Sequence, residues 1–228
     1  TIGTDLEDCQ DCLTLAETYP EIHAAVGVHP TSVTEVTDSD WLDKIEAFAQ
    51  HPKVVAIGEI GLDYFHKAPD GWTPEDYVAR QKSFFRQQLN LAVKLGKNVV
   101  VHTRDSWEDN VTEVSAFNGK LRAVFHCHTG SWQEAQRVTK AGHVVSFTGI
   151  ATFKNALDVR QAVAEAEAGQ FMLETDSPYL APMPYRGKRC EPAYVRFTAE
   201  AIAEFRQETL EALADHTTAT AEAFFDMG

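Results

Sequence analysis

The feature that most constrains the fold is a regular alternation of short apolar runs with longer amphipathic stretches. The candidate strands are Ile22–Val28, Val54–Ile57, Asn98–Val101, Leu121–Phe125, His143–Phe147 and Phe171–Leu173. The candidate helices are Leu6–Thr18, Trp41–Ala49, Pro74–Leu95, Ser131–Ala141, Asn155–Ala168 and a tail from Pro192 to Phe225. Because strands that alternate with helices build βα units, the pattern predicts an α/β protein with a parallel sheet.

Polar side chains stand at the carboxyl ends of most candidate strands. They are His29, Glu59, Asp63, His102, Arg104, Asp105, His126, His128, Glu174 and Asp176. In a doubly wound sheet such residues gather at one switch point, whereas in a (β/α)8 barrel they come from the ends of many strands. Because five strands contribute polar ends, we predict a TIM-type (β/α)8 barrel.

The number of strands indicates that this barrel is incomplete in the given sequence. Six full strands are visible, and a closed barrel of this type has eight. Residues Thr1–Asp5 resemble the tail of a further strand that enters the helix Leu6–Thr18. We therefore expect the first strand–helix unit to be missing, with roughly 40 residues upstream of Thr1. Since there is no linker or low-complexity segment, residues 1–228 are predicted to form one domain.

Composition narrows the classes of partner. With 44% hydrophobic and 24% charged residues, the chain has an ordinary globular composition. No apolar run approaches the ~20 residues that span a bilayer, so no membrane partner is expected. The formal net charge of −14 argues against broad, charge-driven binding to nucleic acid. A bound cation and a few Arg and Lys residues can still dominate the field inside a cleft.

The four cysteines, Cys9, Cys12, Cys127 and Cys190, are scattered along the chain. Cys9 and Cys12 form a C-x-x-C motif, but no second pair follows at the spacing of a zinc ribbon. We interpret them as reduced thiols within a helix, which favours a cytoplasmic location. No obligate protein partner is indicated.

Imidazole and carboxylate groups on neighbouring strand ends form a nitrogen and oxygen donor set suited to Zn²⁺, Mn²⁺ or Mg²⁺. The predicted metal ligands are Glu59, His102, His126 and Asp176, holding one or two ions, with Glu59 placed to bridge a pair. Such ions serve hydrolysis by lowering the pKa of water and by polarising the scissile bond. Asp176 is also placed to accept the proton of the attacking water, which makes it a catalytic candidate.

A single histidine at a strand end is more often a hydrogen-bonded structural residue than a ligand, so the prediction depends on joint placement. The histidines that lack this placement are taken as structural or exposed: His23, His51, His66, His143 and His216. His128 and Glu174 stay open, because residues two apart on a strand face the same side. Either His126 or His128 could therefore be the ligand, and Glu174 is a candidate partner of Asp176 or a group that supports it.

Basic residues gather in Arg186–Arg189, after the Pro-rich loop that follows Asp176. Such a loop is often merely solvated, but beside a metal site it could grip phosphates or carboxylates. We take Arg186, together with Asp63 and Arg104 at the strand ends, as the candidates for substrate binding.

At these residues the sequence resembles the TatD-like family of metal-dependent hydrolases. The matching segments span nearly the whole chain in family order: GVHP (Gly27–Pro30), GEIGLDYF (Gly58–Phe65), VHTRD (Val101–Asp105), FHCHTGS (Phe125–Ser131), SFTGIATFKN (Ser146–Asn155), and ETDSPYLAP continuing into YRGKRCEPAYV (Glu174–Val195). The resemblance implies a TIM-type barrel, metal-dependent phosphodiesterase activity of the DNase kind, and the four metal ligands predicted above. It also implies that His29 lies near the reacting phosphate, which makes His29 a second catalytic candidate.

The sequence departs from the family pattern in four places. The H-x-H of the first strand is absent, Thr31 follows GVHP where the family usually has His, and His128 makes the usual H-C-F into H-C-H. Residues 165–170 also lack the usual Pro and Arg-like residues. The first departure matters most, because the family's H-x-H belongs to the metal site.

The sequence alone leaves three functions open. The leading hypothesis is a metal-dependent deoxyribonuclease or phosphodiesterase that acts on DNA or nucleotide ends through an activated water. The second is a metal-dependent amidohydrolase or esterase that acts on a small molecule. The third is a catalytically inactive binding protein. The predicted ligands do not separate these functions, and Arg186–Arg189 weighs modestly towards phosphate.

Overall fold

The computed structural model describes residues 1–227 and confirms the predicted alternation of strands and helices. The strands are β1 (Ala24–Val26), β2 (Val54–Asp63), β3 (Asn98–Arg104), β4 (Ala123–Phe125), β5 (Val144–Phe147) and β6 (Phe171–Leu173). The chain divides into two compact units, Thr1–Ala123 and Val124–Gly228, called unit 1 and unit 2. The predicted single domain over residues 1–228 stays a prediction.

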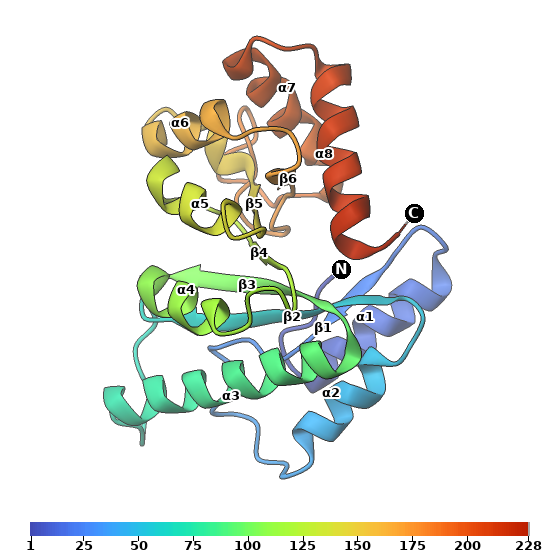
Figure 1. Cartoon of the computed structure of the whole chain (residues 1–228), viewed down its shortest axis with the longest axis vertical. Helices are drawn as coiled ribbons and strands as arrows, with labels where there is room; N and C mark the ends of the chain where they lie inside the picture. Colours follow the sequence, from blue (N-terminus) through green and yellow to red (C-terminus); the bar gives the residue numbers. More distant parts are fainter. Residues whose placement is uncertain (228) are drawn as a thin grey trace. The chain divides into compact units, whose positions relative to one another are not determined.

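In unit 1, β2 pairs in parallel with both β1 and β3 (Figure 1). Ile2 forms a parallel bridge with Ala25 of β1, so the strand-like reading of the first residues is confirmed. The helices are α1 (Leu6–Thr18), α2 (Trp41–Ala49), α3 (Pro74–Leu95) and α4 (Trp107–Ser115). Figure 1 shows α2 and α3 on the same side of these strands.

Helix α3 shows how the sequence sets an element's limits. Thr73 caps its amino end by accepting a hydrogen bond from the Asp76 N–H, and Pro74 occupies the first turn, where its missing donor costs nothing. Gly96 ends the helix in the left-handed conformation, at φ 64°. The buried stripe of α3 is largely apolar, but it includes Gln81 and Gln88. Two glutamines on a buried stripe need internal partners, and they find them on the strands.

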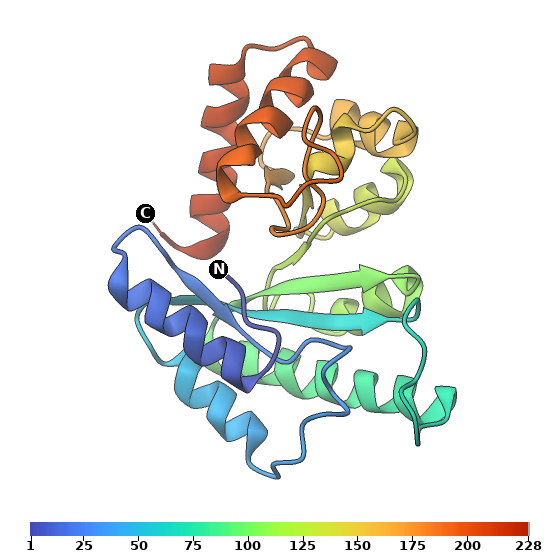
Figure 2. The same cartoon turned by 180° about the vertical axis from the view of Figure 1, so that it is seen from behind.

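In unit 2, β5 pairs in parallel with β4 and with β6. The helical elements are α5 (Trp132–Thr139), the 3-10 turn η1 (Gly149–Thr152), α6 (Leu157–Glu165), the 3-10 turn η2 (Pro192–Tyr194), α7 (Val195–Arg206) and α8 (Leu210–Phe225). Helices α5 to α8 lie around the three short strands (Figure 2). The parallel α/β class predicted from the sequence is therefore confirmed in each unit.

The structure corrects several predicted boundaries. Strand β2 does not end at Ile57 but runs to Asp63, and β3 runs to Arg104, so Glu59 and His102 lie within strands. Helix α4 was missed altogether. The tail from Pro192 is not one helix, because Gln207 adopts a left-handed conformation (φ 56°) that ends α7 before α8 begins. Gly58 and Gly61 lie within β2, where the lack of a side chain allows close contact with β3.

Replacing Gly61 with alanine is expected to lower the free energy of unfolding by about 3 kcal/mol or more. Gly61 has φ 141°, and an added Cβ would lie 2.2 Å from the carbonyl oxygen of His102 on β3. The matched control is Gly71→Ala, because Gly71 also has positive φ (89°) but no atom within 4 Å of the added Cβ. The control should lose about 1–2 kcal/mol. Urea denaturation measures both, and equal losses would contradict the steric argument.

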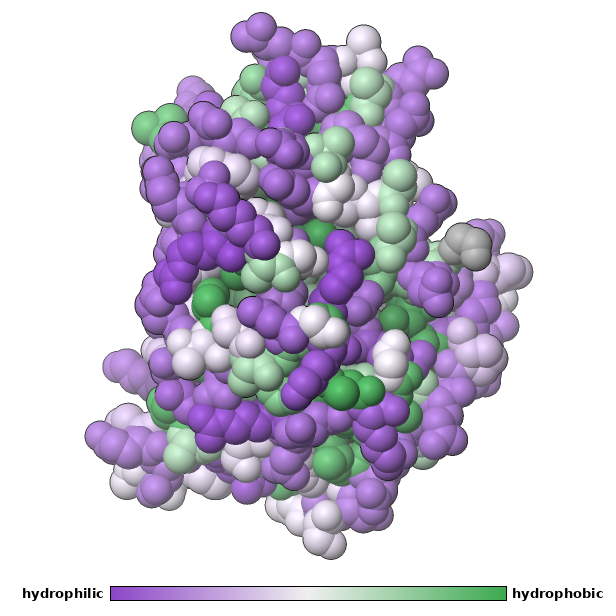
Figure 3. Space-filling view, viewed as in Figure 1, coloured by the Kyte–Doolittle hydropathy of each residue, from purple (hydrophilic) through white to green (hydrophobic). Residues whose placement is uncertain are grey.

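Hydrophilic side chains predominate on the face drawn in Figure 3, and apolar side chains are interspersed among them. In the helices of residues 1–227, no stretch has both the length and the apolar character that crossing a bilayer requires. All four cysteines are free thiols, and Cys9 and Cys12 are buried in α1, as predicted.

Candidate metal centres

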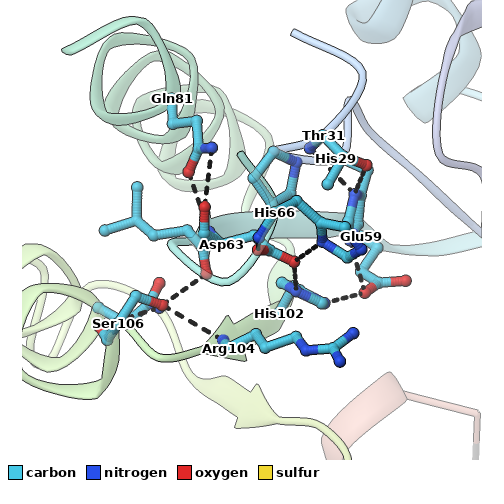
Figure 4. A network of polar contacts seen from close by, with 12 residues as sticks. His29, Thr31, Glu59, Asp63, His66, Gln81, His102, Arg104 and Ser106 are labelled. Atoms are coloured by element: carbon cyan, nitrogen blue, oxygen red, sulfur yellow. Dashed lines mark hydrogen bonds and ion pairs between the residues drawn. The ribbon is translucent and has the colours of Figure 1, made fainter. Parts of the chain in front are cut away.

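Unit 1 brings three of the predicted residues into one cluster, named the β2–β3 cluster: His29, Glu59 and His102. Their ligand atoms all lie within 4.8 Å of one another. Glu59 Oε1 is 2.7 Å from Nδ1 of His102 and 3.2 Å from Nε2 of His29. The rings of the two histidines meet edge to face, with their centroids 4.3 Å apart. One carboxylate oxygen thus serves two imidazoles (Figure 4).

The β2–β3 cluster lies in a largely desolvated position, since its three side chains are only 11–16% exposed. A carboxylate oxygen and an unprotonated imidazole nitrogen both present lone pairs, so each close contact needs a shared proton or a cation between the two atoms. The low exposure strengthens this requirement, because water screens the repulsion poorly there.

Asp63 lies beside the cluster and orients it. Its carboxylate is buried, with Oδ2 2.8 Å from Nδ1 of His66 and 3.1 Å from Nε2 of His102, and Oδ1 accepts from the His66 N–H. Burial acts to raise the pKa of Asp63, but the hydrogen bonds from His102 and His66 outweigh it and hold the pKa well below its usual range. The geometry therefore favours Asp63 as a positioning residue over the predicted direct contact with substrate.

Two glutamines of α3 hold the strand ends that carry the cluster. The side-chain amide of Gln81 accepts from the Asp63 N–H and donates to the Asp63 carbonyl, at 2.9 and 3.0 Å. The amide of Gln88 makes the same pair of bonds to Val28, at 2.7 and 3.1 Å. The sequence analysis missed both residues. The signal available was two amides, seven positions apart, on a stripe that is otherwise mostly apolar.

Thr31, which stands where the family usually has His, contacts the cluster through His29. Its hydroxyl lies 2.7 Å from Nδ1 of His29, and its backbone N–H donates to the same nitrogen at 3.2 Å. Thr31 therefore fixes the orientation of the imidazole ring. At this departure from the family pattern, the Thr31 side chain thus makes a contact that positions His29.

Unit 2 forms a second cluster, named the β4–β6 cluster, from His126, Glu174 and Asp176. Their ligand atoms also lie within 4.8 Å of one another, and Nδ1 of His126 is 3.6 Å from Oε1 of Glu174. These residues directly follow the ends of β4 and β6, as predicted. Asp176 has φ 54°, a left-handed conformation that turns the chain sharply after β6.

Glu174, which was left open from the sequence, belongs to this cluster. Its Oε1 accepts from the Cys127 N–H at 2.7 Å and from the Ser146 hydroxyl. Burial would raise the pKa of Glu174, but His126 and these hydrogen bonds outweigh burial and lower the pKa. Burial, together with the Glu174 charge, raises the pKa of the Cys127 thiol to about 12. The converging ligand atoms of this cluster are therefore nitrogen and oxygen donors.

The structure separates His126 from His128. The argument that both face the same side of a strand is wrong, because β4 ends at Phe125 and Cys127 turns the chain with φ 49°. His128 is buried, and its Nε2 lies 3.1 Å from the Ser131 carbonyl oxygen. Burial lowers the pKa of His128, which keeps the ring neutral near pH 7. Only His126 joins the cluster within residues 1–227.

The other histidines of the sequence analysis lie outside both clusters. His51 pairs with Glu17, His216 with Glu208, and His143 is buried beside Phe125. His66 is half exposed, and it contributes by holding Asp63.

The two arginines proposed for substrate binding are both exposed and both lie against an aromatic ring. The guanidinium carbon of Arg104, whose side chain is labelled in Figure 4, is 3.8 Å from the centroid of Phe65, the residue before His66 in the sequence. The guanidinium carbon of Arg186 is 4.3 Å from the centroid of Phe153. Ring contact restrains each guanidinium while its donors stay accessible to an anion.

The chemistry of the two donor sets fits divalent metal ions. Each combines imidazole nitrogen with carboxylate oxygen, which suits Zn²⁺ and Mn²⁺, and the carboxylates also suit Mg²⁺. In the β2–β3 cluster, His102 has a further carboxylate partner in Asp63, the arrangement that commonly fixes the tautomer of a ligating histidine.

Comparison with known proteins agrees with this donor chemistry. The model of the family described as TatD related DNase matches residues 1–226. The chain is 38% identical over 227 residues to the uncharacterized metal-dependent hydrolase YabD of Bacillus subtilis, covering 98% of this chain and 85% of that protein. It is 33% identical over 231 residues to the 3'-5' ssDNA/RNA exonuclease TatD of Salmonella typhimurium, covering 99% and 86%.

Solved structures give the same answer for the fold. A TatD homologue from Escherichia coli K12 matches with a TM-score of 0.89 and 27% identity, over 99% of this chain and 85% of that chain. This likeness confirms the TIM-type α/β fold class predicted from the sequence. Family model, relatives and fold agree over essentially the same residues, and the chain belongs to the family of TatD-related DNases, a family of metal-dependent hydrolases.

Proposed function

We propose that the chain is a divalent-metal-dependent phosphodiesterase that acts on the ends of DNA strands. The observation that carries the proposal is that imidazole and carboxylate donors converge in two clusters, on the strands or just after them. The name of the Salmonella typhimurium relative, a 3'-5' ssDNA/RNA exonuclease, supports a nucleic-acid substrate. The cytoplasmic location stays a prediction.

In this proposal both clusters hold metal. Glu59 and His102, with His29 adjoining, would hold one ion in unit 1, and His126 and Asp176 would hold another in unit 2. A bound divalent ion lowers the pKa of a water molecule and draws charge from the scissile phosphate. The metal could be Mg²⁺, Mn²⁺ or Zn²⁺, since all three accept such donors.

The side chains supply the remaining chemistry. Asp176 accepts the proton of the attacking water at a carboxylate oxygen. Asp63 and Thr31 hold the rings of His102 and His29 in place through the contacts described above. His29 binds a phosphate oxygen of the reacting ester. Arg104 in unit 1 and Arg186 in unit 2 each pair with phosphate oxygens, as guanidinium groups do well.

The proposal is tested by measuring release of nucleotides from end-labelled DNA and hydrolysis of bis(p-nitrophenyl) phosphate. We expect activity with at least one of Mg²⁺, Mn²⁺ and Zn²⁺, and its loss when a chelator is added. A panel of esters, lactones and amides runs in parallel. If members of that panel are hydrolysed and neither phosphodiester is cleaved, the small-molecule hydrolase replaces the nuclease. If no substrate reacts in any metal, the proposal is rejected in favour of a binding protein.

A further inference from the structure

Unit 2 carries a second feature next to Asp176 that the metal centres do not use. The chain between β6 and α7, orange in Figures 1 and 2, bears three tyrosines and three basic residues. We name residues 179–194 the aromatic–basic loop. Its distinguishing side chains are Tyr179, Tyr185, Arg186, Lys188, Arg189 and Tyr194.

The aromatic–basic loop is tied down rather than free. The Tyr179 N–H donates to the Asp176 carbonyl oxygen at 2.9 Å, and the Cys190 N–H closes the loop on the Pro178 carbonyl oxygen at 2.9 Å. The Met183 N–H donates to the Thr152 hydroxyl of η1 at 2.8 Å. Gly149 of η1 lets the loop approach so closely that an added Cβ would lie 2.3 Å from the Leu180 carbonyl oxygen. The side chains are thus presented from a fixed backbone.

The aromatic rings of the loop comprise one stacked pair and one exposed ring. Tyr185 and Tyr194 stack with centroids 4.6 Å apart and an interplanar angle of 22°, and Phe197 supports both from α7. Tyr179, three residues after Asp176, is 69% exposed. A large ring with that exposure contributes little to the core, and its face is open to a flat partner.

The basic side chains beside these rings have no acidic partner. Arg186, Lys188 and Arg189 are exposed, and none of them forms an ion pair with any residue from 1 to 227. Lys188 Nζ lies 5.7 Å from the Tyr185 centroid, so positive charge and ring faces are presented together. The combination is complementary to a polyanion with exposed bases.

We propose that the aromatic–basic loop binds single-stranded nucleic acid, with bases stacked on Tyr179 and on the Tyr185–Tyr194 pair, and phosphates paired with the basic side chains. A single strand is favoured over a duplex because the base faces of a duplex are already covered by their neighbours. The substrate class rests on the proposed function. The loop begins three residues after Asp176, and the backbone bond between Tyr179 and Asp176 keeps its first residue beside the residue that bears the proposed catalytic carboxylate of unit 2.

Fluorescence anisotropy, with a chelator present so that no cleavage occurs, measures the binding separately from turnover. The probes are a labelled short oligothymidylate, an abasic strand of the same length, and the matching duplex. We expect oligothymidylate to bind more tightly than the duplex. Tyr179→Leu and Tyr194→Leu should each weaken its binding about tenfold, leaving the abasic strand unchanged, whereas Tyr179→Phe retains binding. Arg189→Ala should weaken the binding of both the oligothymidylate and the abasic strand. It should also reduce the slope of log affinity against log salt concentration by about 0.7.

Tyr19→Leu is the matched control, because Tyr19 is 51% exposed but follows α1, away from the loop in the chain. It should bind as the wild type does. Unchanged binding of oligothymidylate by both tyrosine variants of the loop overturns the proposal, as does an equal loss for the base-bearing and abasic strands. A wild-type chain that binds neither strand also overturns it. Failure to hydrolyse any phosphodiester, with this binding intact, instead rejects the proposed function alone.

Discussion

Asp176→Asn is expected to lower kcat for phosphodiester hydrolysis by about 10²–10⁴-fold, while the chain still takes up metal. The amide keeps the size of the carboxylate and one oxygen donor, but it cannot accept the proton of the attacking water. Steady-state kinetics with bis(p-nitrophenyl) phosphate, paired with metal analysis of the purified variant, separates lost basicity from lost metal. The proposed general-base role predicts that KM changes little.

The control for this substitution is Asp158→Asn, since Asp158 is an exposed carboxylate in the first turn of α6 in the same unit. It should keep the wild-type rate. If Asp176→Asn retained full activity, the general-base role would be wrong. If the variant lost both bound metal and activity, the loss of a metal ligand would explain the lower rate, and the general-base role would lose its support.

His102→Ala is expected to weaken metal binding by about a hundredfold or more and to abolish turnover. Removing a residue that only hydrogen-bonds to a metal ligand already costs about 10–100-fold in affinity, so removing a ligand should cost at least as much. The imidazole is the shared partner of Glu59 and Asp63, so its removal leaves two carboxylates without their common neighbour. Isothermal titration with Mn²⁺ and a phosphodiesterase assay on the same preparation test both parts.

His51→Ala serves as the comparison for this result. His51 pairs with Glu17 at 3.2 Å and precedes β2, at the opposite end of the strand from Asp63. It should bind Mn²⁺ with unchanged affinity. Normal Mn²⁺ affinity in the His102 variant would remove His102 from the ligand set.

Most of the fold was readable from the sequence because local signals agreed with the tertiary structure. The Thr73 cap, the Pro74 start and the Gly96 stop bound α3 at the predicted residues. The strands were placed correctly, but their bounds were not: β2 and β3 extend beyond the predicted residues, whereas β1, β4 and β5 are shorter than predicted. The continuation of β2 depends on Gly58 and Gly61, which allow the close approach of β3. Helix α4 has a short polar sequence with two buried residues, which leaves little periodicity to detect.

The four predicted metal ligands converge in pairs in the structure, but the contacts that position them were not predicted. Each metal ligand inferred from the sequence lies in one of the two clusters. What the sequence could not give is backbone direction, such as the turn at Cys127 that separates His126 from His128. It also could not give partners from distant elements: Gln81 reaches Asp63 across 18 positions, and Gln88 reaches Val28 across 60. Such pairings depend on packing that local patterns do not encode.

The paired glutamine bonds of α3 have a consequence for metal uptake. Seven helical residues span about 10.5 Å, so α3 bonds to the end of β2 and to the segment that follows β1 at two separate points. The segments carrying His29 and Asp63 therefore cannot slide past each other without breaking at least one of these two pairs of hydrogen bonds. Loading an ion into the β2–β3 cluster should require side-chain adjustment and proton release, with little reorganisation of the main chain. The scaffold is preorganised, and its helix, rather than the ion, sets the spacing of the donors.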